Sequence, residues 1–151
     1  MKIELEKNNG IATIRISRQE KHNSLTLKMY QELGEAFCQI RDDCDIRVAV
    51  LTGEGEKAFC VGADLYESIP ALANGNFDIS YWDKAHLKNL KLYKPVIAAV
   101  RGMCFGGGFE ILLATDIRVA SQDAVFQFPE PKHGFVPAGG TLVRLVRQIG
   151  Y

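Results

Sequence analysis

The sequence has no long apolar segment, no excess of charge of either sign and no paired cysteine motif. Its continuous apolar runs, Val48–Leu51 and Pro95–Val100, are far too short to cross a bilayer. Lys plus Arg and Asp plus Glu both number 18, so the formal charge is zero. This balance gives no reason to expect nucleic acid or a membrane as a partner. The first residues alternate polar and apolar side chains, unlike a signal peptide, and we expect a cytoplasmic protein.

Cysteine and histidine are few and scattered. The cysteines are Cys38, Cys44, Cys60 and Cys104, and the histidines are His22, His86 and His133. No two cysteines form a C-x-x-C pair, so reduced thiols are expected. The histidines lack metal-ligand spacing, and no metal site is predicted.

Hydrophobic periodicity predicts strands that alternate with helices. Period-two or continuous apolar patterns predict strands at Ile3–Glu6, Ile11–Ile16, Val48–Leu51, Pro95–Val100, Ile117–Ala120 and Val125–Phe128. Asn8-Asn9-Gly10 separates the first two, which predicts a β-hairpin. Apolar residues three and four apart predict helices at Leu25–Ile40, around Trp82–Tyr93, at Gly107–Ala114 and at Leu142–Ile149. The 151 residues, 47% hydrophobic and 24% charged, fit one α/β domain with buried strands over 1–151.

Two segments share one plan, in which a buried strand leads through a glycine-containing loop to a helix. Gly62-Ala63 lies in the first loop, and Gly106-Gly107-Gly108 lies in the second. Glycine allows close backbone approach, and a helix N-terminus presents unpaired N–H groups. The N–H groups of Ala63 and Gly107 are therefore candidates for an oxyanion hole.

Each glycine segment also has a simpler interpretation. The Gly106–Gly108 triplet equally suits tight packing between a helix and a strand. The stretch Gly53–Ala58 loosely matches a dinucleotide-binding pattern, but Phe59-Cys60-Val61 continues extended instead of opening a helix. We therefore set the dinucleotide interpretation aside.

Two carboxylates are candidates for acid–base chemistry. Glu110 falls in the first turn of a predicted helix, where a stabilising helix-end charge is the simpler interpretation. Glu130 lies between Pro129 and Pro131, which predicts an extended, rigid backbone that aims the carboxylate in one direction. An exposed loop charge is the alternative for Glu130.

Several segments together resemble the enoyl-CoA hydratase/isomerase (crotonase) family. They are Lys21-His22-Asn23-Ser24-Leu25, Gly62-Ala63-Asp64-Leu65, Lys94–Gly102, Gly106–Glu110, Pro129-Glu130 and Pro137-Ala138-Gly139-Gly140. The similarity runs in order along nearly the whole chain. It implies a spiral of ββα units that acts on acyl-CoA thioesters.

The resemblance also assigns residues. It places the catalytic carboxylates on Glu110 and Glu130 and the oxyanion hole on the backbone N–H groups of Ala63 and Gly107. It places coenzyme A along Ser24, Leu25, Lys57, Val61, Ala63, Asp64 and Leu65. Tyr66 is a departure, because some relatives have a phosphate-binding lysine there. Coenzyme A would arrive with the substrate, and no separate cofactor is expected.

The reaction that this resemblance favours is hydration of a trans-2-enoyl-CoA, a lyase reaction of fatty acid metabolism. The alternatives are a double-bond isomerase, a carnitinyl-CoA-like dehydratase, a hydrolase, a decarboxylase, and an inactive fragment or binding relative. Family members usually continue for about another hundred residues of helical structure and form trimers or hexamers. We therefore expect a core truncated at its C-terminus.

Two surfaces remain open to interpretation from sequence. The last helix would expose an apolar face, with Arg144 and Arg147 on its polar side; that face comprises Leu142, Leu145, Val146 and Ile149. Six apolar residues suit either an acyl pocket or ordinary core packing: Ile69, Leu72, Phe77, Tyr81, Trp82 and Leu87.

Overall fold

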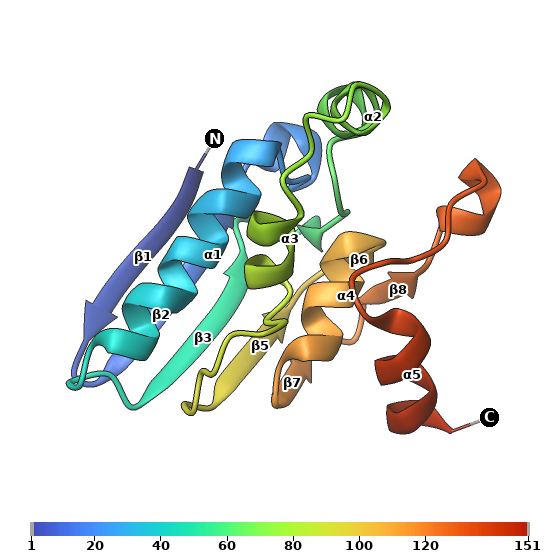
Figure 1. Ribbon diagram of the computed structural model, residues 1–151. Helices are drawn as coiled ribbons and strands as arrows, with labels where there is room; N and C mark the ends of the chain where they lie inside the picture. The colour runs from blue at the N-terminus through green and yellow to red at the C-terminus, as the bar shows by residue number, and fades with distance from the viewer. Residues whose placement is uncertain (1, 151) are drawn as a thin grey trace.

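The computed structural model describes residues 2–150, which begin with a β-hairpin (Figure 1). Strands β1 (Lys2–Asn8) and β2 (Ile11–Ser17) pair antiparallel. Between them Asn9 and Gly10 adopt φ of 49° and 82°. Two consecutive positive φ angles are typical of the tight turn that Asn-Gly favours, so the predicted hairpin is confirmed.

Two sheets follow from a repeated chain path. The larger sheet has the order β1-β2-β3-β5-β7 and is parallel beyond the hairpin; the smaller sheet, β4-β6-β8, is wholly parallel. The further strands are β3 (Val48–Gly53), β4 (Ala58–Cys60), β5 (Val96–Val100), β6 (Met103–Phe105), β7 (Ile117–Ala120) and β8 (Val125–Gln127). Each strand of the smaller sheet directly follows one of the larger sheet. The chain is thus a spiral of ββα units, as the resemblance implied.

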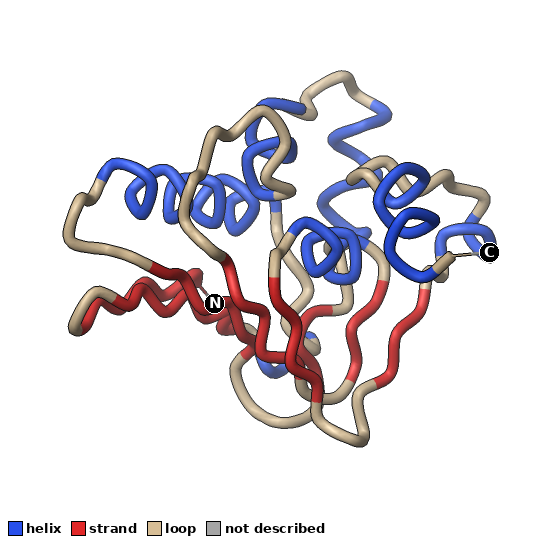
Figure 2. The backbone as a smooth tube through the Cα atoms, turned by 90° about the horizontal axis from the view of Figure 1, so that it is seen from below, coloured by secondary structure: helices blue, strands red, loops and turns tan. Residues whose placement is uncertain are grey.

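The helices gather on one side of the strands (Figure 2). They are α1 (Leu27–Asp42), α2 (Leu65–Ala73), α3 (Ile79–Ala85), α4 (Gly107–Ala114) and α5 (Thr141–Ile149), with short 3₁₀ turns η1 (Gln19–Lys21) and η2 (Glu130–His133). Thr26 caps α1 by accepting a hydrogen bond of 3.1 Å from the Met29 N–H.

The core lies between α1 and the larger sheet. The side chains of Leu33, Phe37 and Ile40 on α1 are fully buried against Ile14 and Leu51 of the sheet. Full burial of such a side chain contributes roughly 1.5–3 kcal/mol. This packing fixes the strands whose far ends lead into the loops of the candidate site.

The helix predicted around Trp82–Tyr93 is misplaced. In the structure α3 ends at Ala85, and Leu87 and Asn89 have φ of 53° and 56°, which a helix does not accommodate. The helix-like spacing instead comes from an irregular segment, whose Leu87, Leu90 and Leu92 pack against the core. Burial, not helical periodicity, explains these apolar residues.

Candidate active site

Two glycine-containing loops meet where β4 and β6 end. Gly62 has φ of 94°, and a methyl group built on it would lie only 2.9 Å from the Gly107 nitrogen. Only glycine tolerates both this backbone conformation and this approach. A methyl group built on Gly107 would in turn lie 3.7 Å from the Ala63 nitrogen. The structure therefore brings the backbone of Ala63 beside that of Gly107.

The two amides have no protein acceptor. Gly107 begins α4, so its N–H has no partner within the helix. The Leu25 N–H donates a hydrogen bond of 2.8 Å to the Gly62 carbonyl, and the Leu25 carbonyl accepts one of 2.8 Å from the Asp64 N–H. These two bonds use the residues on either side of Ala63 but not Ala63 itself. Within residues 2–150 neither the Ala63 nor the Gly107 N–H donates a hydrogen bond to the protein. Two adjacent free donors of this kind suit an anionic oxygen.

Glu110 projects from the first turn of α4 and is only 2% exposed. Its Oε1 accepts bonds of 2.7 Å from the Gly139 N–H and 2.7 Å from the Thr141 hydroxyl, and 3.4 Å from the Thr141 N–H. A methyl group on Gly139 would fall 2.5 Å from Oε2. The carboxylate is thus held by the segment before α5 as well as by its position at a helix N-terminus.

Glu130 lies in a 3₁₀ turn, not in extended backbone. It is the first residue of η2, and Pro129 before it has φ −79° and ψ −8°. The extended conformation predicted from Pro131 is therefore wrong, because Glu130 begins a turn. The Phe135 N–H closes this segment by donating a hydrogen bond of 3.0 Å to the Glu130 carbonyl. The turn nevertheless fixes the side chain against the second glycine loop. A methyl group on Gly106 would meet Glu130 Oε1 at 3.2 Å.

The carboxyl of Glu130 lies in a partly desolvated setting. Burial raises its pKa above the ordinary value, and the neighbouring charge of Glu110 adds to the rise, although its own backbone N–H and His133 oppose it. Its Oε2 is buried and has no partner among the described residues. A carboxyl of this kind is easier to protonate than a solvated one, which suits a proton donor.

A cavity of about 350 Å³ joins these groups. Its wall contains the loop residues Val61, Gly62, Ala63, Gly106 and Gly107, the carboxylates Glu110 and Glu130, and a mainly apolar remainder: Leu65, Ser68, Ile69, Leu72, Phe77, Ile79, Trp82, Pro129, His133, Phe135, Val136, Pro137 and Ala138. Both carboxylates and both candidate amide donors therefore face one apolar space. Ligand sites commonly combine an apolar wall with a few convergent polar groups.

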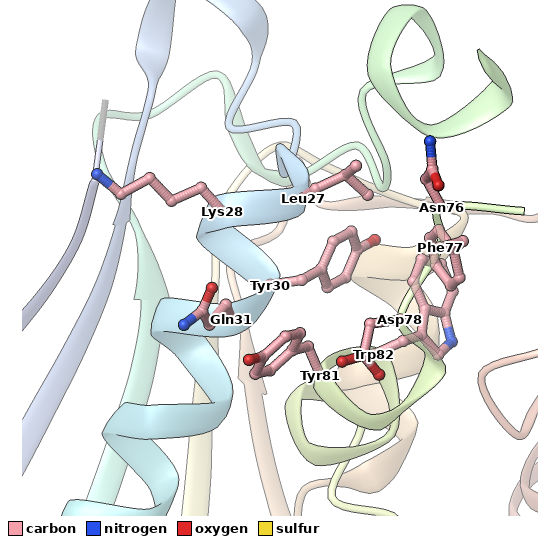
Figure 3. Close-up of a pocket in the computed structure, with 9 residues that line it drawn as sticks. All are labelled: Leu27, Lys28, Tyr30, Gln31, Asn76, Phe77, Asp78, Tyr81 and Trp82. Carbon is pink, nitrogen blue, oxygen red and sulfur yellow. The ribbon is translucent and has the colours of Figure 1, made fainter. Parts of the chain in front are cut away.

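A second hollow of about 290 Å³ adjoins this cavity, and Figure 3 shows the residues that line it. Phe77 and Trp82 line both spaces and form a shared wall. Of the six apolar residues left open from sequence, Ile69, Leu72, Phe77 and Trp82 line the main cavity. Tyr81 lines only the hollow, and Leu87 packs on the core.

The residues predicted to line coenzyme A divide into groups. Val61, Ala63 and Leu65 line the cavity, and Leu25 is bonded to the same loop. Lys57 is exposed and directly precedes β4, at the opposite end of that strand from Val61.

Two further members of that set have structural partners. Arg18 Nη1 contacts Asp64 Oδ2 at 2.8 Å and donates to the Ser24 hydroxyl at 3.2 Å. Asp64 also caps α2 by accepting from the Tyr66 N–H at 2.9 Å. Their side chains therefore shape the loop, and any contact with a thioester would come from its backbone.

Four residues of this region were not predicted as site residues from the sequence: Tyr30, Ser68, His86 and Thr141. Thr141 follows the Pro137–Gly140 turn directly, and that turn was the signal available for it. Tyr30 lies on α1, Ser68 lies on α2 and His86 directly follows α3, and no local motif marks any of the three. Each of these three residues has a buried polar atom without a hydrogen-bond partner within residues 2–150, namely Tyr30 Oη, Ser68 Oγ and His86 Nε2.

The two loop cysteines pack as small buried side chains. Cys60 and Cys104 are fully buried and face each other across β4 and β6. Burial raises the pKa of the Cys60 thiol to about 12, which disfavours a nucleophilic thiolate. Within the described part of the chain, no group of three or more His, Cys, Asp or Glu side chains is arranged to hold a metal ion, and no helix is long and apolar enough to span a membrane.

With this geometry established, comparison with known proteins identifies the class. Residues 6–151 match the enoyl-CoA hydratase/isomerase family, and the chain belongs to that family. It is 42% identical over 132 residues to an (E)-benzylidenesuccinyl-CoA hydratase of Thauera aromatica, covering 87% of this chain and 52% of the relative. It is also 42% identical over 144 residues to a carnitinyl-CoA dehydratase of Escherichia coli K12, covering 95% and 54%.

Solved structures agree with these sequence matches. A crystal structure of an enoyl-CoA hydratase from Bacillus anthracis superposes with a TM-score of 0.88 at 35% identity, over 99% of this chain and 58% of that one. A carnitinyl-CoA dehydratase from Mycobacterium avium gives 0.85 at 32% identity, over 98% and 57%. The chain spans about half the length of the curated relatives it matches.

Proposed function

We propose that the protein is an enoyl-CoA hydratase, which adds water across the double bond of a trans-2-enoyl-CoA. The observation that carries this proposal is the convergence of Glu110, Glu130 and two free amides on one apolar cavity. Relatives named as hydratases and dehydratases support a lyase rather than a double-bond isomerase. Two carboxylates suit a reaction that must both take and give a proton.

The thioester oxygen would lie between the Ala63 and Gly107 N–H groups. As water attacks C3, the electron pair of the double bond moves toward the carbonyl, and negative charge develops on that oxygen. Donors aimed at the developing charge typically lower the barrier by a few kcal/mol each. The apolar cavity wall strengthens this interaction by excluding water.

The carboxylates would divide the proton transfers. Glu110, held as an acceptor by Gly139 and Thr141, positions the water and takes its proton as the C3–O bond forms. Glu130, whose pKa burial raises, delivers a proton to C2. The product is a 3-hydroxyacyl thioester, and proton exchange between the carboxyl groups or with solvent restores the starting state. Coenzyme A enters with the substrate, and the mechanism requires no further cofactor.

Hydration of crotonyl-CoA, followed by loss of the enoyl absorbance, tests this proposal. Glu110→Gln and Glu130→Gln should each lower kcat at least about a hundredfold without unfolding the chain. Glu56→Gln is the matched control, because the Glu56 side chain is 82% exposed. A residual rate within about tenfold of wild type would assign Glu130 less than roughly 1.4 kcal/mol of the barrier, too little for a proton donor.

A carnitinyl-CoA dehydratase is the second candidate, favoured by the relatives that bear this name at 42% identity. The same four groups would serve it in the reverse direction, since loss of water retraces its addition. Assaying carnitinyl-CoA beside crotonyl-CoA separates the two, because the ratio of their kcat/KM values reports which acyl group the cavity prefers. We further propose that the full-length protein forms a homotrimer or hexamer, which sedimentation measures.

A further inference from the structure

The proposed chemistry leaves the buried hydroxyl of Tyr30 unused. Tyr30 lies in the first turn of α1 and is only 2% exposed. Its Oη is buried without a hydrogen-bond partner in the described chain. A buried phenol without a partner is costly, since it has lost its hydrogen bonds to water and gained none. A phenylalanine would fill the same space without that cost.

The hydroxyl lies beside Gly107, whose amide belongs to the proposed oxyanion site, and Tyr30 lines the neighbouring hollow. A methyl group built on Gly107 would lie 2.7 Å from Tyr30 Oη and 3.7 Å from the Ala63 nitrogen. The ring is held in place by Trp82, with ring centroids 4.5 Å apart. Figure 3 shows the hydroxyl of Tyr30 pointing away from α1, whereas that of Tyr81 points in the opposite direction.

The hydroxyl is also kept in its donor form. Burial raises the pKa of Tyr30 well above its ordinary value, and the neighbouring Cys60, Glu110 and Glu130 raise it further. A neutral phenol can donate one hydrogen bond at any pH at which the protein works. The surrounding groups therefore maintain a hydrogen-bond donor beside Gly107.

We propose that Tyr30 Oη donates a third hydrogen bond to the thioester oxygen, so that Tyr30 is a further catalytic residue of the site. The proposal rests on the hydratase function insofar as a thioester is the ligand, but it concerns only charge on the oxygen. The interaction strengthens as the enolate-like charge develops, so it acts on kcat more than on KM.

Tyr30→Phe removes only this oxygen and is the direct test. Loss of one donor to an oxyanion lowers kcat by about a hundredfold, and we expect KM to stay within about threefold. The thermal midpoint should stay equal or rise, because the deleted hydroxyl has no partner. Tyr81→Phe is the matched control, since it deletes a hydroxyl that points away, and it should leave turnover unchanged.

A second measurement separates this proposal from the reaction itself. Acetoacetyl-CoA forms an enolate that absorbs in the near ultraviolet, and its bound pKa reports the donors around its oxygen. Tyr30→Phe should raise that pKa by about one unit or more, equivalent to a tenfold or greater loss of preference for the enolate. A merely structural tyrosine would leave it unchanged.

The outcomes are distinguishable. If wild type hydrates crotonyl-CoA but Tyr30→Phe changes neither kcat nor the enolate pKa, the Tyr30 proposal is wrong and the hydratase stands. If wild type hydrates no enoyl-CoA, yet Tyr30→Phe raises the pKa of bound acetoacetyl-CoA, the Tyr30 proposal stands and the hydratase is wrong. Absence of acetoacetyl-CoA binding by wild type would overturn both.

Discussion

Acidification should destabilise the protein through one buried histidine, His86. Its side chain is 0% exposed at the end of α3, and Nδ1 lies 2.8 Å from the Trp82 carbonyl oxygen. Burial lowers its pKa to about 4; the charges of Lys88 and Arg144 act in the same direction, while the Trp82 bond and Asp83 oppose. The imidazole is therefore neutral in the folded protein, and Nδ1 carries the proton that bonds to Trp82.

The direction of this pH effect on stability follows from the number of protons bound in the folded and unfolded states. In the unfolded chain His86 titrates near its ordinary pKa of about 6.5. Between that value and about 4, the unfolded chain binds a proton that the folded chain refuses, so the free energy of unfolding falls as pH falls. From roughly pH 7.5 to pH 5 the loss is about 2 kcal/mol, approaching about 3 kcal/mol below pH 4. Glu130, with its raised pKa, acts in the opposite sense and offsets part of the loss.

Urea unfolding at a series of pH values measures the effect, and His86→Phe isolates it. Phenylalanine keeps the aromatic contact with Trp82, now at a centroid distance of 4.5 Å, but cannot titrate. The variant should therefore lose less stability between pH 7.5 and pH 5 than wild type, by about 2 kcal/mol. Parallel pH profiles for the two proteins would refute the assignment of the acid sensitivity to His86.

Two further perturbations address the site. Gly107→Pro removes the N–H proposed to bind the thioester oxygen, and Gly107→Ala is its control, because alanine adds the same close contact with Tyr30 but keeps the N–H. The proline variant should have a kcat about a hundredfold or more below that of the alanine variant. Equal turnover of the two variants would contradict the oxyanion assignment. Thr141→Val removes the 2.7 Å hydrogen bond to Glu110 and should lower the free energy of unfolding by about 1.5–3 kcal/mol, together with the hydration rate. Thr141→Ser keeps the hydroxyl and should retain both. Urea unfolding and the crotonyl-CoA assay measure the two effects, and equal results for the valine and serine variants would contradict this role of the hydroxyl.

Much of the fold was readable from sequence because local patterns coincided with burial. The hairpin at Asn9-Gly10 and the helix Gly107–Ala114 were predicted where they occur, since turn residues and helix boundaries are local properties. Strand β6, only three residues long, was read as part of a glycine-rich turn. A strand that short has no period of its own, and its pairing with β4 and β8 is a long-range event.

The site was less predictable where its geometry depends on tertiary contact. The adjacency of Ala63 and Gly107 follows from two matching strand–loop–helix segments, and the sequence showed that match. The contact of Thr141 with Glu110 joins residues 31 apart, and no local pattern announces it. Arg144 was predicted on the polar side of α5, but it turns inward and donates to the carbonyls of His86 and Gly139, at 3.1 and 3.2 Å.

The exposed apolar residues of α5 follow from the same anchoring. Thr141 and Arg144 tie one side of the helix to Glu110, His86 and Gly139, which leaves the opposite side to solvent. Leu142, Val143, Val146 and Ile149 are 64%, 54%, 38% and 73% exposed, whereas Leu145 is only half-buried. The apolar face predicted from the sequence is thus present, with Val143 added to it.

The spiral explains why the candidate site depends on the whole chain. The unit of β3 and β4 supplies Ala63, that of β5 and β6 supplies Gly107 and Glu110, and that of β7 and β8 supplies Glu130 and, through the following turn, Thr141. Ala63, Gly107 and Glu130 each come shortly after a strand of the smaller sheet, and Glu110 lies one helical turn further along α4. The parallel register of that sheet therefore sets the spacing of the amides and carboxylates at once. A change that shifts one of its three-residue strands would therefore displace every component of the site that its own unit supplies, relative to the components supplied by the other two units.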